Sequence, residues 1–154
     1  MSKNLINNEK LAVIGCSGLV GSSILRCALE KGYEVNGTMR NIKDSAKINY
    51  LKKLKNFEKL NLFKAEMSNE NDFNFCLQDI STLFIACLVP TYKGFDGTLA
   101  KELDDERGYN EIINPTVNGC INILKSAKKL DVKNVVICSS TSSTNPIPPV
   151  PIKN

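Results

Sequence analysis

Three glycines stand at steps of three near the start of the chain, at Gly15, Gly18 and Gly21. An apolar run of strand length precedes them at 10–14, and a run of helical character follows at 19–31. This arrangement can hold a dinucleotide diphosphate. The first glycine permits a tight turn, the second lets backbone approach the phosphates, and the third lets the helix pack closely on the strand. The first N–H groups of the helix then face the negative charge. An ordinary strand, turn and helix without a ligand is the alternative interpretation.

Positive charge follows the second predicted strand, at 33–40. A site for NAD usually has an acid there, about 20 residues after the turn, to bind the ribose 2′-hydroxyl. This chain has Arg40 instead, with Lys43 and Lys47 close behind it. A guanidinium group offers a planar fork for a 2′-phosphate, so the pattern favours NADP over NAD. An exposed arginine at the start of a basic helix is the alternative.

The elements that must position these residues alternate along the sequence. Apolar runs predict strands over 10–14, 33–40, 60–65, 81–89 and 132–138. Helical patterns are present at 19–31, 41–56, 69–78 and 99–130. In the last of these, Pro115 either kinks the helix or marks where its regular part begins. The buried stripe predicted for it is Leu103, Ile112, Val117, Ile121, Leu124 and Ala127.

This alternation predicts an α/β fold of the Rossmann type. We expect a doubly wound parallel sheet in the order 3-2-1-4-5, with helices on both faces. A ligand is then expected at the carboxyl ends of the strands, across the switch point between strands 1 and 4.

Composition narrows the class of protein. The chain has 154 residues, of which 42% are hydrophobic and 23% charged, as expected for one globular domain. Its formal charge of +4 comes from scattered lysines, which does not indicate a nucleic-acid surface. No apolar run is long enough to span a membrane, so we predict no membrane partner and a cytoplasmic location.

Histidine and cysteine usage constrains the chemistry. The sequence has no histidine, which excludes histidine-based catalysis, and we predict no metal site. The six cysteines form no CxxC pair and most lie in apolar runs, so we expect them to be buried thiols in a reducing compartment.

Several stretches together resemble a known family. They are similar to the extended short-chain dehydrogenases/reductases of the NAD-dependent epimerase/dehydratase family, in the branch of dihydroflavonol, cinnamoyl-CoA and anthocyanidin reductases. The turn, which has the form GxxGxxG, comprises Gly15, Cys16, Ser17, Gly18, Leu19, Val20 and Gly21. The other matching segments are Thr38-Met39-Arg40, Lys64-Ala65-Glu66-Met67, Phe84-Ile85-Ala86-Cys87-Leu88, Asn114-Pro115-Thr116-Val117-Asn118-Gly119 and Val135-Val136-Ile137-Cys138-Ser139-Ser140.

The resemblance implies a cofactor, NADP(H), and a role for each segment. The GxxGxxG turn would hold the diphosphate, and Arg40 and Lys47 would bind the 2′-phosphate. Glu66 and Met67 would lie against the adenine, and Ala86, Cys87 and Leu88 beside the nicotinamide ribose. Ser140 would be the catalytic serine that hydrogen-bonds a carbonyl or alcohol substrate, which exchanges a hydride with the cofactor.

The largest departure from that family concerns the proton donor. Its members have a tyrosine, with a lysine four residues later, after strand 5. Here the last tyrosine is Tyr109, and the one lysine in the tail is Lys153. We therefore expect a polar lead-in at 1–9, a cofactor-binding domain at 10–144, a proline-rich tail at 145–154 and no C-terminal substrate domain, as in a chain truncated after strand 5.

Two interpretations stay open. The chain is either an NADP-dependent reductase or a non-catalytic NADP-binding module, such as a sensor, a partner subunit or a truncated gene product. A sheet that ends at strand 5 has an exposed edge, which predicts self-association.

Overall fold

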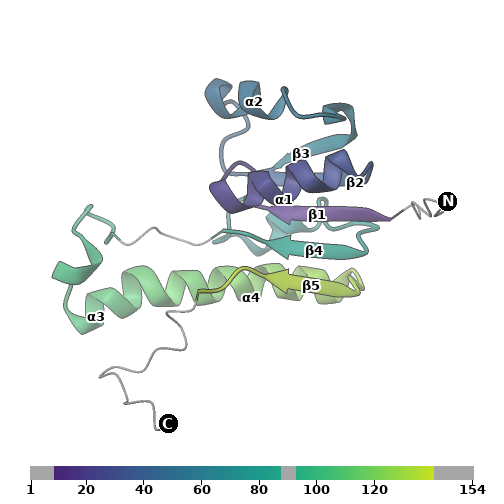
Figure 1. The fold of residues 1–154 in the computed structure, drawn as a ribbon. Coiled ribbons are helices and arrows are strands. Elements are labelled where there is room, and N and C mark those ends of the chain that lie inside the picture. Colours follow the sequence, from purple (N-terminus) through teal and green to yellow (C-terminus); the bar gives the residue numbers. More distant parts are fainter. Residues whose placement is uncertain (1–8, 88–92, 141–154) are drawn as a thin grey trace, which may run out of the picture.

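Five parallel strands form one sheet in the order β3-β2-β1-β4-β5 (Figure 1). The computed structural model describes residues 9–87 and 93–140. The strands are β1 (Lys10–Ile14), β2 (Glu34–Met39), β3 (Leu60–Lys64), β4 (Thr82–Ile85) and β5 (Asn134–Ile137). The predicted fold class and strand order are therefore confirmed. Each strand is shorter than or equal to the predicted run, and the end of the fourth run lies outside the described residues.

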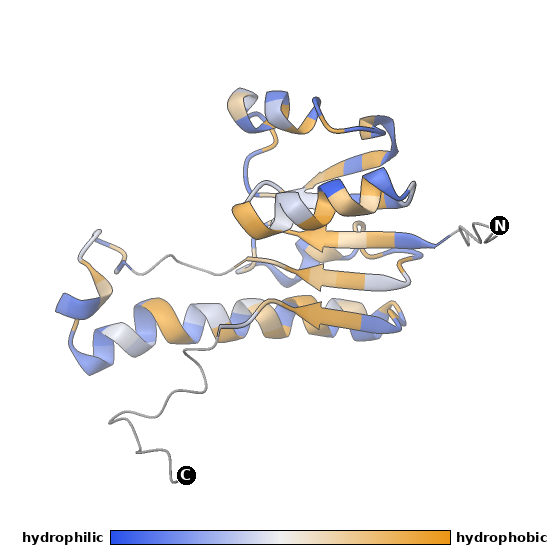
Figure 2. Cartoon of the chain, viewed as in Figure 1, coloured by the Kyte–Doolittle hydropathy of each residue, from blue (hydrophilic) through white to orange (hydrophobic). Residues whose placement is uncertain are grey.

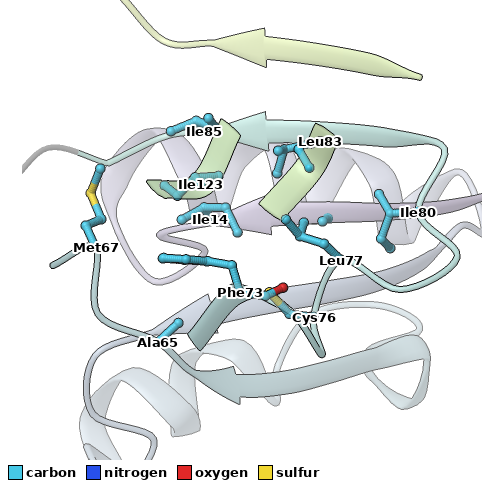
Figure 3. Close-up of a cluster of buried hydrophobic side chains, with 12 residues drawn as sticks. Ile14, Ala65, Met67, Phe73, Cys76, Leu77, Ile80, Leu83, Ile85 and Ile123 are labelled. Carbon is cyan, nitrogen blue, oxygen red and sulfur yellow. The ribbon is translucent and has the colours of Figure 1, made fainter. Parts of the chain in front are cut away.

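Helices cover both faces of the sheet, as predicted. Helices α1 (Leu19–Glu30) and α2 (Ser45–Leu51) pack on one face, and α4 (Asn114–Lys129) packs on the other with a short 3-10 helix, η2 (Glu70–Phe73). Strand β1 contributes to both layers because its side chains alternate. Leu11 and Val13 join the α1 side, whereas Ala12 and Ile14 join the α4 side. Figure 3 shows the second layer, in which Ile123 of α4 lies beside Ile14 and Ile85.

The register brings the carboxyl ends of three strands together. Ile14 at the end of β1 pairs with Thr38 of β2 on one side and with Ile85 of β4 on the other. The segments that follow these residues consequently leave the sheet at the same edge. Because β2 and β4 lie on opposite sides of β1, this edge is the switch point at which a ligand is expected.

The second helix is shorter than the helix predicted over 41–56. The Asn41 side chain accepts the Lys43 N–H at 2.9 Å, and the Asp44 side chain accepts the Lys47 N–H at 3.2 Å. These bonds form a turn and an N-cap, so α2 begins only at Ser45. Turns and a 3-10 helix, η1 (Phe57–Lys59), follow it. Similarly, the helix predicted over 69–78 is reduced to η2, whose N-cap is Asn69.

The long helix predicted over 99–130 is divided into several pieces. They are η3 (Ala100–Glu102), α3 (Asp105–Gly108), a π-helical turn η4 (Tyr109–Ile113) and α4. The carboxylate of Asp104 accepts the Arg107 N–H at 2.8 Å and so starts a new helix at Asp105. Pro115 lies in the first turn of α4, where its missing N–H has no helical partner to lose, and it thus marks where the regular part begins.

The buried stripe predicted for this helix is correct at Ala127, only half-buried at Leu103 and Ile112, and wrong at Val117, Ile121 and Leu124. Helix α4 buries Gly119, Ile123, Ser126 and Ala127, whereas Val117, Ile121 and Leu124 are exposed. Small residues determine which face of α4 is buried, because they let the helix approach the segment after β3. A Cβ at Gly119 would lie 2.9 Å from the Cβ of Met67. The Ser126 hydroxyl donates to the Glu70 carbonyl at 3.1 Å and fixes the same orientation.

Strand β5 lies at the edge of the described sheet. Its apolar residues Val135, Val136 and Ile137 are exposed. In Figure 2 most of β5 has the colour of hydrophobic residues. Self-association through this edge stays a prediction. None of the described helices is long and apolar enough to cross a membrane.

We expect truncation of Ile123 to destabilise the fold far more than truncation of Ile121 on the same helix. Ile123 is fully buried, so Ile123→Ala should cost about 2–5 kcal/mol, whereas Ile121→Ala should cost about 0.5 kcal/mol. Urea unfolding of both variants measures the difference. Equal losses would contradict the orientation assigned to α4.

Candidate dinucleotide site

A cleft of about 570 Å³ lies at the carboxyl edge of the sheet, between the ends of β1, β2, β3 and β4. It is lined by Ile14, Gly15, Ser17, Gly18, Thr38, Met39, Arg40, Asn41, Lys47, Ala65, Glu66, Met67, Phe73, Ala86 and Cys87. The cleft lies at the switch point between β1 and β4, where the strand order reverses.

The glycine turn forms one wall of the cleft. Gly15 has a φ of +81°, which side chains disfavour, and its carbonyl accepts the Gly18 N–H at 3.0 Å. Helix α1 then approaches this carbonyl so closely that a Cβ at Gly21 would lie 2.1 Å from the Gly15 oxygen. Only glycine fits at that position without a backbone shift. The third glycine therefore permits close packing between helix and turn, as predicted.

The start of α1 faces the cleft without a protein cap. Gly18 is the N-cap residue, so no side chain caps the helix, and its first turn contains no acidic residue. The N–H groups of such a first turn have no helical acceptors, and the helix dipole adds partial positive charge. The arrangement favours an anionic group of a ligand at this point.

Two cationic side chains lie on the opposite wall. Arg40 follows β2 directly and is exposed, and no ion pair is formed by it among the described residues. The Lys47 Nζ lies 3.5 Å from an Asp44 carboxylate oxygen, so its charge is partly compensated. Arg40 is thus the cation on this wall with the greater capacity for an incoming anion.

The floor of the cleft comes from the segments after β3 and β4. The Glu66 N–H donates to the Asp72 carboxylate at 2.9 Å, which fixes the chain as it leaves β3. Phe73 is buried beneath it. After β4, Cys87 comes so near the turn that a Cβ at Gly15 would lie 2.6 Å from the Cys87 Cβ.

The cleft gathers many, but not all, of the residues predicted from sequence. Those that line it are Gly15, Ser17, Gly18, Arg40, Lys47, Glu66, Met67, Ala86 and Cys87. Cys16 and Gly21 are buried behind the turn, and Leu19 and Val20 are exposed on α1. Ser140 is exposed beyond β5 and does not line the cleft, and Leu88 lies outside the described residues.

Six lining residues were not predicted as site residues, namely Ile14, Thr38, Met39, Asn41, Ala65 and Phe73. Of these, Thr38, Met39 and Ala65 lie in segments that match the family. Thr38 was detectable in principle, because the end of β2 must pair with the end of β1. Phe73 was not, since its place depends on how the connection from β3 to β4 folds under the sheet.

The cysteines differ in exposure: Cys16 and Cys76 are buried, Cys87 and Cys120 are half-buried, and Cys27 and Cys138 are exposed. Burial raises the pKa of Cys16 and of Cys76 to about 12. Burial, reinforced by Cys120 and opposed by Arg40, raises the pKa of Cys87 to about 11. These thiols stay protonated at neutral pH. The expectation of buried thiols is wrong for Cys27 and Cys138, which are exposed.

The fold and the glycine turn define a dinucleotide-type α/β domain, and the comparisons place it in a family. The chain belongs to the NAD-dependent epimerase/dehydratase family, whose model matches residues 11–153. It is 33% identical over 138 residues to the dihydroflavonol 4-reductase of Dianthus caryophyllus, covering 89% of this chain and 35% of that protein. It is 30% identical over 139 residues to the anthocyanidin reductase of Arabidopsis thaliana, and this match covers 90% of this chain and 38% of that protein.

Solved structures agree on the fold. The yeast methylglyoxal/isovaleraldehyde reductase Gre2, complexed with NADPH, superposes with a TM-score of 0.66 at 22% identity, covering 85% of this chain and 37% of that one. The chain spans 35% to 41% of the length of the curated relatives it matches. The resemblance to dihydroflavonol, anthocyanidin and cinnamoyl-CoA reductases is thus confirmed.

We expect Gly21→Ala to destabilise the turn, because the new methyl group would overlap the Gly15 carbonyl. The loss should be about 1–3 kcal/mol. Gly108→Ala is the matched control, since a Cβ there meets nothing within 4 Å. Thermal unfolding compares the two variants, and a tolerated Gly21→Ala would contradict the close approach of α1.

Thiol labelling should separate the two groups of cysteines. At mildly alkaline pH, iodoacetamide should modify the exposed Cys27 and Cys138 quickly. It should modify Cys16, Cys76 and Cys87 slowly, because their raised pKa values leave little of the reactive thiolate and their lower exposure limits access to the reagent. Mass spectrometry of native and urea-unfolded protein gives the rates. Cys87 labelling as fast as Cys27 would show that the floor of the cleft is more open than described.

Proposed function

We propose that this chain binds NADP(H) in the cleft and is the cofactor-binding part of a reductase that exchanges a hydride with a carbonyl or alcohol substrate. The position of Arg40 carries the proposal. It lies at the carboxyl end of β2, where a carboxylate would select NAD, and it lines the same cleft as the glycine turn.

The charges of the cleft support this assignment. Among its described lining residues there are two cations, Arg40 and Lys47, and one carboxylate, Glu66. Glu66 follows β3 rather than β2, so it is not in the position of the acid that binds a ribose 2′-hydroxyl. A doubly charged 2′-phosphate would find a guanidinium on one wall, while the diphosphate would face the start of α1 on the other.

Bound NADPH would supply the hydride, and the chain's own residues would bind and orient it. Ala86 and Cys87 line the cleft beyond β4, and we expect them to lie beside the nicotinamide ribose. Ser140 follows the neighbouring strand β5 and is the candidate to hydrogen-bond a substrate oxygen. A non-catalytic NADP-binding module is the second candidate, because Ser140 is not among the residues that line the cleft.

Arg40→Ala should weaken NADPH binding by about 10- to 100-fold and leave NADH binding unchanged, because a charge-assisted contact to the 2′-phosphate is lost. Calorimetric titration with both nucleotides measures the effect. Arg26→Ala is the control, since Arg26 lies on α1 outside the cleft and its nearest ion pair is with Glu30. Equal affinity for NADPH and NADH, unchanged in Arg40→Ala, would refute the proposed cofactor.

A second assay separates the two candidates. The chain as printed should bind NADPH without oxidising it in the presence of simple aldehydes and ketones, because it lacks the tyrosine that would protonate the product oxygen. Substrate-dependent loss of NADPH absorbance, abolished by Ser140→Ala, would instead favour a catalytic chain.

A further inference from the structure

Thr38 makes an unusual double connection between the second strand and the glycine turn. Its backbone pairs with Ile14, the last residue of β1. Beyond Ile14, the Gly15 N–H donates to the Thr38 hydroxyl oxygen at 3.2 Å, and the Cys16 N–H donates to the Thr38 carbonyl at 3.0 Å. One residue therefore binds the first two N–H groups of the turn.

The hydroxyl bond is needed because of the path of the turn. The positive φ of Gly15 takes the chain out of the β1–β2 ladder, and the Gly15 N–H donates to a side chain instead of a strand carbonyl. A backbone donor away from water without an acceptor is costly. The hydroxyl of Thr38, a side chain that is only 2% exposed, fulfils that need and selects one geometry for the turn.

The same strand end carries Arg40. Arg40 follows β2 directly, two residues after Thr38, and both residues line the cleft. Thr38 thus joins the two parts of the site, the turn with its N–H donors and the strand end with its cation. Loss of the hydroxyl bond would free the N–H donors of the turn, while Arg40, which follows β2, stays in place.

We propose that Thr38 is a positioning residue of the dinucleotide site: its hydroxyl locks the first glycine of the turn to the strand end that carries Arg40. This proposal rests on the function proposed above. The turn serves the diphosphate, which NADPH and NADH share, whereas Arg40 serves the 2′-phosphate, which only NADPH has. Loss of the Thr38 hydroxyl should consequently lower the binding affinities for NADPH and NADH by the same factor.

Thr38→Val tests this directly, because it keeps the shape of the side chain and removes the acceptor. We expect NADPH and NADH affinities to fall together by about tenfold, with their ratio unchanged. Thr38→Ser, which keeps the hydroxyl, should bind both nucleotides with the affinity of the native chain. Thr82→Val is the control, since Thr82 lies in the neighbouring strand β4 outside the cleft. A folded Thr38→Val protein that binds both nucleotides as tightly as the native chain would overturn the proposal.

Hydrogen exchange provides a readout that needs no nucleotide. The Gly15 amide should exchange faster in Thr38→Val than in the native chain and Thr38→Ser, while amides in the middle of α4 stay unchanged. If Thr38→Val does not fold, Thr38→Ala replaces it in both measurements. Unchanged Gly15 exchange would overturn the proposal whatever the nucleotide result. Failure of the native chain to bind NADPH, with faster Gly15 exchange in the variant, would refute the proposed function and leave the turn lock standing.

Discussion

The close contact between the start of α1 and the carbonyl of Gly15 is the constraint on which the candidate site depends. A Cβ at Gly21 would lie 2.1 Å from that oxygen, so the helix can sit against the turn only because no side chain intervenes. This contact places the uncapped first turn of α1 beside the end of β1. The doubly wound topology then brings β2 and β4 to either side of the same point. A bulkier residue at Gly21 would move the helix and its N–H groups away from the cleft.

Electrostatics and backbone geometry act together at this edge of the sheet. One wall offers N–H groups and a helix dipole, which suit a diphosphate, and the other offers the Arg40 side chain, which suits a phosphate monoester. Thr38 connects the walls through its bonds to the turn. The pocket between them is polar at these two points and apolar along Phe73 and Met67, as expected for a nucleotide with charged ends and a flat base.

The features that were predictable from sequence are those set by local chemistry. Apolar and β-branched residues predicted the five strands, and glycine spacing predicted the turn, because both depend on few neighbouring residues. The division of the long helix depended on an Asp104 cap, and the buried face of α4 on small residues that accept Met67. The Thr38 bond to Gly15 joins residues 23 apart, so only the register of β1 and β2 reveals it. Ser140 follows β5 and is not among the residues that line the cleft, although the strand itself was predicted.

The most direct test of the central claim is a titration of isotope-labelled protein with NADP⁺, followed by amide NMR. We predict that the largest shifts occur at Gly18, Leu19 and Val20, at the start of α1, and at Arg40 and Asn41, after β2. Amides of β5 and of the far end of α4 should not move. Shifts confined to other surfaces, or no shifts at saturating nucleotide, would contradict the assignment of this cleft as a dinucleotide site.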